Sequence, residues 1–271
     1  MQLHSEDEIR SAVRTRYGAI ATQTDTNGCC STPTLVQIEG ITDRAPVTVV
    51  PGEQLGYESS DLEKIPEGAE LGLGCGNPLG IASLQLGEVV LDLGSGGGID
   101  CFLASEKVGP TGKVIGVDMT PEMISRARGN AAKGSFTGVE FRLGEIEHLP
   151  VADSSVDVVI SNCVVNLSPD KPQVFREIFR ALKPGGRVAI ADLIERGEIP
   201  DDVRNDLALI SCCIGGAMQP SEIESLLRSA GFGEIRVAFN KESKKIIRDI
   251  LSTVRVEDFV ASAFIEGRKP L

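Results

Sequence analysis

The chain has little of what a zinc ribbon, a nucleic-acid surface or a membrane anchor requires. Only two histidines occur among 271 residues, His4 and His148, and no two cysteines have the Cys-x-x-Cys spacing, which excludes the local motifs of zinc fingers and ribbons. The net charge is −12 and lysine and arginine form no run, so no nucleic-acid partner is expected. Residues 1–10 carry three acids and one arginine, with no apolar stretch of signal-peptide or membrane-span length behind them. We therefore expect no membrane partner and a cytoplasmic protein.

Cysteine is the residue type that this chain does have. The seven cysteines, an odd number, stand at positions 29, 30, 75, 101, 163, 212 and 213. A chain of this length folds without covalent crosslinks, and in a reducing compartment its cysteines are thiols. A ligand site assembled from cysteines that are distant in the sequence therefore stays open, although a local metal motif is excluded.

From residue 88 onward, short apolar runs alternate with helical patterns. The strand-like runs are 89–93, 113–118, 139–143, 156–162, 187–194, 234–239 and 258–265, and the helical ones are 99–108, 121–132, 171–182 and 221–230. This alternation predicts an α/β fold of the Rossmann-like kind, a mostly parallel seven-stranded sheet with helices on both faces. Ligands of such sheets bind beyond the carboxyl ends of the strands.

Three regions follow from this pattern. Residues 1–87, with an early helix at 6–17 and segments interrupted by proline and glycine, are expected to form an N-terminal cap over the sheet. Residues 88–195 form the expected Rossmann-like core. Residues 196–271 form a C-terminal region with the last strands of the sheet.

A glycine-rich turn follows the first core strand. The run 91–98 reads LDLGSGGG, so that Asp92 precedes alternating glycines at a strand-to-helix turn, where a ligand can approach the backbone closely. The spacing differs from the dinucleotide-binding GxGxxG. The next strand ends in Asp118, about 20 residues beyond the glycines, where a carboxylate can accept hydrogen bonds from both hydroxyls of a ribose.

A third motif, Gly144-Glu145-Ile146-Glu147, follows the third strand. Together with the glycine-rich turn and the strand that ends in Asp118, this motif resembles those of class I S-adenosylmethionine methyltransferases, over roughly residues 88–194. The resemblance implies S-adenosylmethionine as cofactor, with Asp92 near its amino acid moiety and Ile146 and Glu147 near its adenine. The full set of cofactor-binding residues that it implies is Asp92, Gly94, Ser95, Gly96, Asp118, Met119, Ile146, Glu147 and Asn162.

Three cysteines can reach the same edge of the sheet. Cys163 comes directly after the fourth strand, Cys75 stands between two glycines in the cap, and Cys213 follows the fifth strand and a helix. Three converging thiols suit a soft, pyramidal ion such as trivalent arsenic better than magnesium or calcium. Its lone pair could then be aimed at the methyl group of the cofactor.

The segments around these cysteines are similar to those of arsenite methyltransferases. The matching runs are NGC at 27–29, GCGNP at 74–78, SNCVVNL at 161–167 and CIGGA at 213–217. The resemblance implies that Cys75, Cys163 and Cys213 bind As(III), that Cys29 joins them in redox chemistry, and that arsenite and methylarsenite are substrates. It implies mono- and dimethylated products and a role in arsenic detoxification.

Repeated methylation also requires a source of electrons. Each transfer raises arsenic formally to the pentavalent state, and a cysteine pair can return two electrons by closing a disulfide. Cys29 and Cys75 are the candidate pair, and an external thiol of the glutathione or thioredoxin type would reopen it. Cys30 and Cys212 remain alternates, whereas Cys101, on the first core helix, is expected in the core.

Two other functions stay open. The chain could methylate an organic small molecule, with the cysteines only packing, or it could bind metalloids through its thiols without turnover. The sequence also departs from the family at Leu73, where some members carry a tyrosine. An aromatic contact to the sulfonium from this position is therefore not expected.

Overall fold

The computed structural model describes residues 4–22, 35–36, 47–134, 136–244, 247 and 256–271. Cys29 and Cys30 lie outside these residues. No helix of the described part is long and apolar enough to cross a bilayer.

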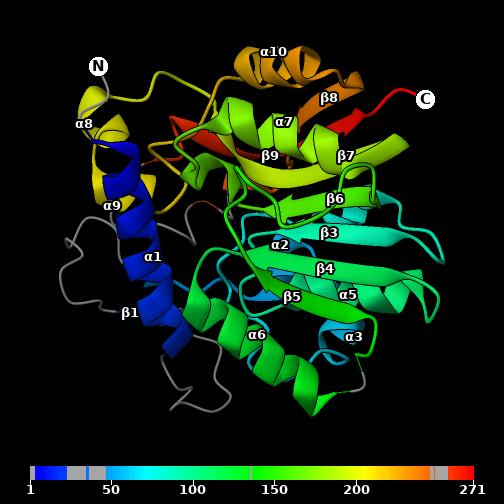
Figure 1. Ribbon diagram of the computed structural model, residues 1–271. Coiled ribbons are helices and arrows are strands. Elements are labelled where there is room, and N and C mark those ends of the chain that lie inside the picture. Colours follow the sequence, from blue (N-terminus) through cyan, green and yellow to red (C-terminus); the bar gives the residue numbers. More distant parts are fainter. Residues whose placement is uncertain (1–3, 23–34, 37–46, 135, 245–246, 248–255) are drawn as a thin grey trace.

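A seven-stranded sheet runs through the molecule, in the order β5-β4-β3-β6-β7-β9-β8 (Figure 1). Neighbouring strands from β5 to β7 are parallel, and β9 is antiparallel to both β7 and β8. The strands are β3 (Val89–Leu93), β4 (Lys113–Asp118), β5 (Val139–Leu143), β6 (Val156–Asn162), β7 (Leu182–Glu195), β8 (Gly233–Phe239) and β9 (Val260–Arg268). The predicted fold, a mostly parallel seven-stranded sheet, is confirmed.

The predicted bounds match for the first four strands and differ for the last three. β8 begins one residue earlier than expected, whereas β9 begins two residues later and ends three residues later. β7 includes residues 183–186, which the predicted bounds left between the helix 171–182 and the strand 187–194. The strand is irregular there, because its pairing with β6 shifts between Val156 and Val158, and Gly185 has a φ of 79°.

Helices cover both faces of the sheet, as expected. One face packs on α7 (Lys171–Ala181) and α10 (Pro220–Ala230), and the other on α4 (Leu79–Ala82), α5 (Ile99–Val108) and α6 (Pro121–Lys133) (Figure 1). Successive residues of a strand point to opposite faces. Accordingly Val90 joins the core under α5, and Leu91 joins the core under α7.

Shorter elements gather at the carboxyl ends of the parallel strands. There α1 (Glu6–Thr22) packs against α6, η1 (Val165–Leu167) and α9 (Leu207–Ile210) (Figure 1). The remaining elements are a two-stranded antiparallel pair of β1 (Leu35–Val36) and β2 (Val47–Thr48), and the helices α2 (Gly52–Leu55), α3 (Ser59–Leu62) and α8 (Asp201–Arg204). α1 is longer than the predicted 6–17, because its second half carries Ile20 and Ala21 into contact with Met123 of α6.

Candidate active site

One pocket lies at the carboxyl ends of β3, β4 and β6, under α1. Every cofactor-binding residue that the sequence implied lines this pocket, and so does Cys163. Its roof comes from Arg10, Val13 and Tyr17 of α1. The pocket therefore lies where parallel sheets bind their ligands.

The glycine turn after β3 forms the floor of the pocket. Gly94 has a φ of 69°, and a Cβ at this position would stand 2.2 Å from a methyl carbon of Val164. Gly94 and Ser95 both donate their backbone N–H to the carbonyl oxygen of Val117 in β4, at 2.7 and 3.0 Å.

The hydroxyl of Ser95 is buried and has no hydrogen-bond partner within the described residues. A buried hydroxyl without a partner is rare, and it indicates a polar group that belongs to a ligand.

Two carboxyl groups border this floor, that of Asp92, which is buried, and that of Asp118, which is half-buried. Asp118 accepts hydrogen bonds from the backbone N–H of Gly96 at 3.0 Å and of Thr120 at 2.8 Å. Its burial raises the pKa of the carboxyl group, although these bonds lower it. Burial also raises the pKa of Asp92 well above its ordinary value, and the neighbouring charge of Asp100 adds to this effect. Both groups would gain from a hydrogen-bond donor or a positive charge on a ligand.

Ile146 and Glu147 form the wall at the end of β5. Ile146 belongs to the core under α7, whereas the buried carboxylate of Glu147 accepts a hydrogen bond of 2.6 Å from the hydroxyl of Ser168. Arg10 of α1 lies 3.6 Å from the same carboxylate oxygen of Glu147, and Arg14 forms an ion pair with Glu145. These contacts attach α1 to the wall of the pocket.

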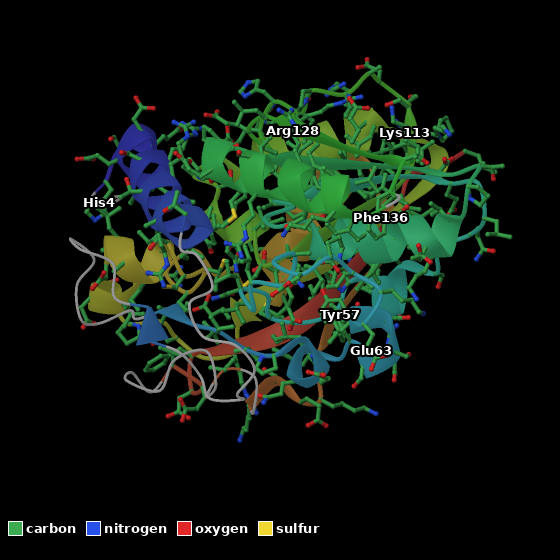
Figure 2. The ribbon with its side chains drawn as sticks, turned by 90° about the horizontal axis from the view of Figure 1, so that it is seen from below. His4, Tyr57, Glu63, Lys113, Arg128 and Phe136 are labelled. Carbon is green, nitrogen blue, oxygen red and sulfur yellow. The ribbon has the colours of Figure 1, made fainter. Side chains whose placement is uncertain are left out.

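A chain of hydrogen bonds joins the pocket to the loop that carries Cys75. Tyr57, which is labelled in Figure 2, lies between α2 and α3, and its hydroxyl donates to Asp100 at 2.8 Å. The side-chain amide of Asn162, at the end of β6, donates to the Tyr57 oxygen at 3.0 Å and accepts from the backbone N–H of Cys75 at 3.1 Å. A Cβ at Gly74 would stand 2.6 Å from this amide, so only glycine permits the contact. Asn162 thus fixes the Cys75 loop besides lining the pocket.

The structure brings together the three cysteines expected to meet. Cys75, Cys163 and Cys213 lie in one buried cluster beneath α1, and they are 0, 7 and 1 % exposed. The hydroxyl of Ser262 in β9 holds the Cys75 loop from below, donating to the Cys75 carbonyl oxygen at 2.6 Å. Of the three cysteines, only Cys163 also lines the pocket. The thiol cluster therefore opens to the pocket through Cys163.

Among the three thiols, Cys163 is the one poised to ionise. Side-chain contacts with the thiols of Cys213 and then of Cys75 lower the pKa of Cys163 well below its ordinary value despite its burial. Burial raises the pKa of Cys75 and of Cys213 instead. Because the thiolate is the form that binds soft ions, Cys163 is the first ligand that the cluster offers.

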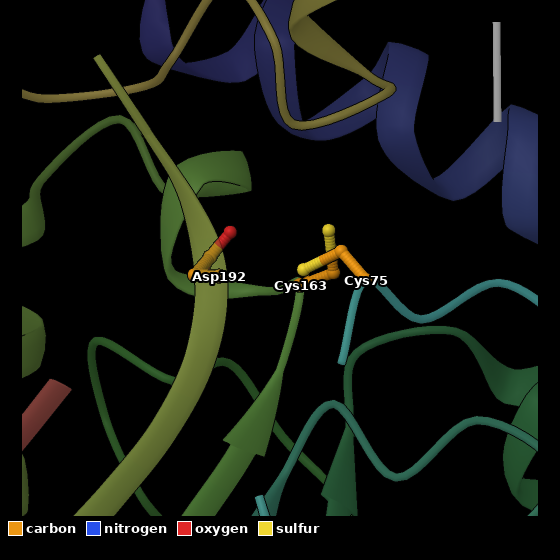
Figure 3. A group of neighbouring side chains, drawn as sticks. All are labelled: Cys75, Cys163 and Asp192. Carbon is orange, nitrogen blue, oxygen red and sulfur yellow. The ribbon is translucent and has the colours of Figure 1, made fainter. Parts of the chain in front are cut away.

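Two residues at this cluster were missed by the sequence analysis. Asp192 of β7 is 1 % exposed, and its carboxylate lies within 4.8 Å of the sulfurs of Cys75 and Cys163 (Figure 3). Tyr17 of α1 packs on the thiol cluster and lines the pocket as well. A signal existed for Asp192, since it is an acid inside the otherwise apolar run VAIADLI, but a sequence does not show which way such a side chain points.

The cysteines outside this set of three lie in different parts of the chain. Cys101 is fully buried in the core between α5 and the sheet, as predicted, and its thiol donates to Asp92 at 3.2 Å. Cys212 is half-buried beside the thiol cluster. Cys29, and with it the proposed pair with Cys75, lies outside the described residues.

Comparison with known proteins agrees with this geometry. Residues 84–231 match a family described as a methyltransferase domain. The chain is 49 % identical to an arsenite methyltransferase of Halobacterium salinarum, over 97 % of this chain and 67 % of that protein. It is 34 % identical to human arsenite methyltransferase, over 89 % of this chain and 64 % of the human protein. The chain thus spans about two thirds of the length of these two curated relatives.

A solved structure shows the same likeness. The crystal structure of an arsenic(III) S-adenosylmethionine methyltransferase from Chlamydomonas reinhardtii superposes with a TM-score of 0.58 at 32 % identity, covering 82 % of this chain and 74 % of that one. The sheet order, the acid-glycine turn and the family match define a class I S-adenosylmethionine-dependent methyltransferase. Within that class, the chain belongs to the arsenite methyltransferase family.

Proposed function

We propose that this chain transfers methyl groups from S-adenosylmethionine to trivalent arsenic held by the thiolates of Cys75, Cys163 and Cys213. One observation carries the proposal: Cys163 is part of the cofactor pocket and of the buried thiol cluster at once. A substrate bound by this cluster would therefore face the pocket directly. The activity for which these relatives are named supports the same reaction.

The pocket fits the cofactor in three respects. The unpartnered hydroxyl of Ser95 and the carboxylate of Asp118 offer one donor and one acceptor for polar groups of a nucleoside. Asp92 and Asp100 offer buried carboxyl groups to an ammonium group, and Met119 and Ile146 offer apolar walls for a ring. When bound, S-adenosylmethionine supplies a methyl group on a positively charged sulfur.

The residues of the cluster would hold the arsenic and orient it. As each arsenite hydroxyl leaves as water, it takes the proton of one incoming thiol, so that arsenite and three thiols give one neutral As(III) trithiolate and three water molecules. No separate general base is needed, because the nucleophile is the lone pair of arsenic. The rigid attachment of the Cys75 loop to Asn162 and Ser262 would keep that lone pair in one direction, and positioning of this kind can supply much of a rate enhancement.

Methylation oxidises arsenic by two electrons, and further methylation requires their return. We propose that Cys29 and Cys75 supply them by closing a disulfide with release of two protons. An external thiol, of the glutathione or thioredoxin type, would then reduce this disulfide. The thiols of the cluster are free in the described structure, in keeping with work in the reducing cytoplasm.

We also propose the three-part organisation that the sequence suggested, with a cap at 1–87, the core at 88–195 and a C-terminal region at 196–271. The cap contributes the roof helix α1 and the Cys75 loop, and the C-terminal region contributes Cys213 and Ser262. Each region outside the core therefore supplies part of the proposed arsenic site.

The test is methyl transfer from labelled S-adenosylmethionine to arsenite with excess thiol, with products separated by chromatography and detected by their arsenic. We expect mono- and dimethylated arsenicals from the full chain. Cys163→Ser should abolish them while cofactor binding by calorimetry persists, which also serves as the control for folding. If the wild-type chain binds the cofactor but methylates no arsenical, an organic acceptor becomes the better interpretation.

Cys29→Ser tests the redox proposal separately. Because its thiol is assigned to electron return and not to arsenic binding, the variant should lose more activity on inorganic arsenite than on methylarsenite. Equal losses on the two substrates would refute the accessory redox role of Cys29.

A further inference from the structure

The thiol cluster contains a donor that arsenic does not require. The sulfurs of Cys75 and Cys163 and a carboxylate oxygen of Asp192 all lie within 4.8 Å of one another (Figure 3). The thiol of Cys213 lies beside this group and donates to the carbonyl oxygen of Cys163 at 2.7 Å, but it is not one of the three. Three donors, two sulfurs and one oxygen, are thus gathered in a buried place.

Asp192 is held in the manner of a metal ligand. Its Oδ1 accepts hydrogen bonds from the backbone N–H of Leu193 at 2.8 Å and from the amide of Asn166 at 2.9 Å, whereas Oδ2 accepts only a longer bond of 3.3 Å from the Asn166 backbone. A carboxylate has about four acceptor positions, so Oδ2 retains a lone pair. Bonds of this kind orient the carboxylates of metal sites.

Ligand type and number separate the two kinds of ion that could bind here. Trivalent arsenic with three thiolates is a complete unit of three sulfur ligands, which leaves the side chain of Asp192 without a role. Zn²⁺ and Cd²⁺ instead take four ligands in a tetrahedron and combine cysteine sulfur with carboxylate oxygen. Hard cations such as Mg²⁺ prefer oxygen donors alone. The donor set therefore suits a thiophilic divalent cation.

We propose that Cys75, Cys163 and Asp192 form a binding site for Zn²⁺ or Cd²⁺, with water as the fourth ligand, and that this cation competes with arsenite for the thiols. The competition rests on the proposed function, whereas binding of the cation does not. A bound cation would occupy the thiols and close the cluster to arsenite until arsenite displaced it.

The first experiment titrates Cd²⁺ into the reduced full chain and follows the ultraviolet charge-transfer band of cadmium thiolates. Zn²⁺ affinity is then measured by competition with a chromophoric chelator. Asp192→Asn is expected to weaken cation binding by roughly ten- to a hundredfold, the range found when groups around a metal are changed, while leaving As(III) binding intact. Cys163→Ser should remove the band of this site, and the neighbouring Cys212→Ser is the matched control that should keep it.

A measurement on the unchanged protein guards against a variant that fails to fold. X-ray absorption at the zinc edge should report a light oxygen shell together with sulfur. A shell of sulfur alone, absence of cation binding, or equal affinity in wild type and a folded Asp192→Asn would overturn the proposal.

Adding arsenite separates this proposal from the proposed function. Release of the cation by arsenite supports the competition. If the cation binds through sulfur and oxygen but arsenite neither displaces it nor becomes methylated, the cation site stands, and the competition and the proposed function both fall.

Discussion

The thiol of Cys213 donates to the backbone carbonyl oxygen of Cys163 across 2.7 Å, and both residues have left-handed backbone, with φ values of 67° and 59°. Residues other than glycine rarely adopt this conformation, which costs of order 1–3 kcal/mol and clusters at functional sites. At Cys163 it turns the chain sharply between β6 and η1, and at Cys213 it follows the end of α9. The two sharp turns place the two thiols against each other.

The closeness of the two thiols predicts how they react with iodoacetamide. Because the side-chain contact with Cys213 is the largest cause of the low pKa of Cys163, Cys163 should be alkylated with a pH midpoint below that of an ordinary thiol. Cys213→Ser should move that midpoint, which is measured for Cys163 by peptide mass spectrometry across a pH series. The pH midpoint of Cys163 alkylation should rise, because a serine hydroxyl is shorter and reaches the Cys163 sulfur less well.

The adjacent cysteine offers the control for this experiment. Cys212 is not among the main causes that lower the pKa of Cys163, so Cys212→Ser should move the midpoint of Cys163 far less than Cys213→Ser does. Equal midpoints in wild type and Cys213→Ser would contradict the account of Cys163 as the thiol that ionises first.

Much of the fold was readable in the sequence, because strands of a parallel sheet carry apolar runs bounded by glycine and acidic residues. The bounds of β3 to β6 were predicted residue for residue, and the acid-glycine turn was found in the wall of the pocket. The start of β7 was not predictable, since Leu182 pairs with Val156 of β6 across an irregularity in the ladder. Pairing between distant segments leaves no local pattern.

The thiol cluster was predicted in part, and the limits have physical causes. The positions of Cys75, Cys163 and Cys213 relative to the strands placed them at one edge of the sheet. Asp192 was missed because a sequence gives alternation along a strand but not the direction of a single side chain near its end. The role of Asn162 in fixing the Cys75 loop depends on hydrogen bonds across 87 residues of chain, which no spacing rule covers.

Tyr57→Phe should loosen the Cys75 loop. The change removes the hydroxyl that donates to Asp100 and accepts from Asn162, and it leaves two buried polar groups short of a partner. Such a loss costs about 1–3 kcal/mol, which urea unfolding would measure. Since the link to the Cys75 loop runs through Asn162, we expect a higher KM for arsenite with a smaller change in the affinity for S-adenosylmethionine. A change confined to cofactor affinity would show that the link does not reach the thiols.

Asp100 should make stability depend on pH. Burial raises the pKa of its carboxyl group from 3.8 to about 6 in the folded chain, so between these two values the folded state binds more protons than the unfolded state. The contribution of this group to stability is thus fully present below pH 3.8 and is lost as the pH rises through about 6. The side chain of Asp100→Asn does not titrate, so the variant does not lose stability in this way as the pH rises. The substitution also lowers the pKa of Asp92, because the charge of Asp100 is one of the causes that raise it.

The measurement compares urea unfolding of the ligand-free wild type and Asp100→Asn across this window. We expect the free energy of unfolding of the variant, relative to that of wild type, to increase as the pH rises from 4 to 6. A constant difference between the two proteins would mean that Asp100 is charged in the folded chain throughout.

A pair of glycine substitutions separates the cofactor turn from the rest of the fold. Gly94→Ala introduces a Cβ where the backbone has a φ of 69° and where Val164 stands 2.2 Å away, so Val164, which follows Cys163, must move. We expect loss of S-adenosylmethionine binding by calorimetry and a lower free energy of unfolding.

Gly129→Ala is the matched change in α6, where the glycine is exposed and an added Cβ meets nothing within 4 Å. It should stabilise the chain by roughly 0.5–1 kcal/mol, because alanine favours a helix, and it should leave cofactor binding intact. If Gly94→Ala binds the cofactor as tightly as Gly129→Ala does, the turn after β3 does not form the floor of the cofactor site.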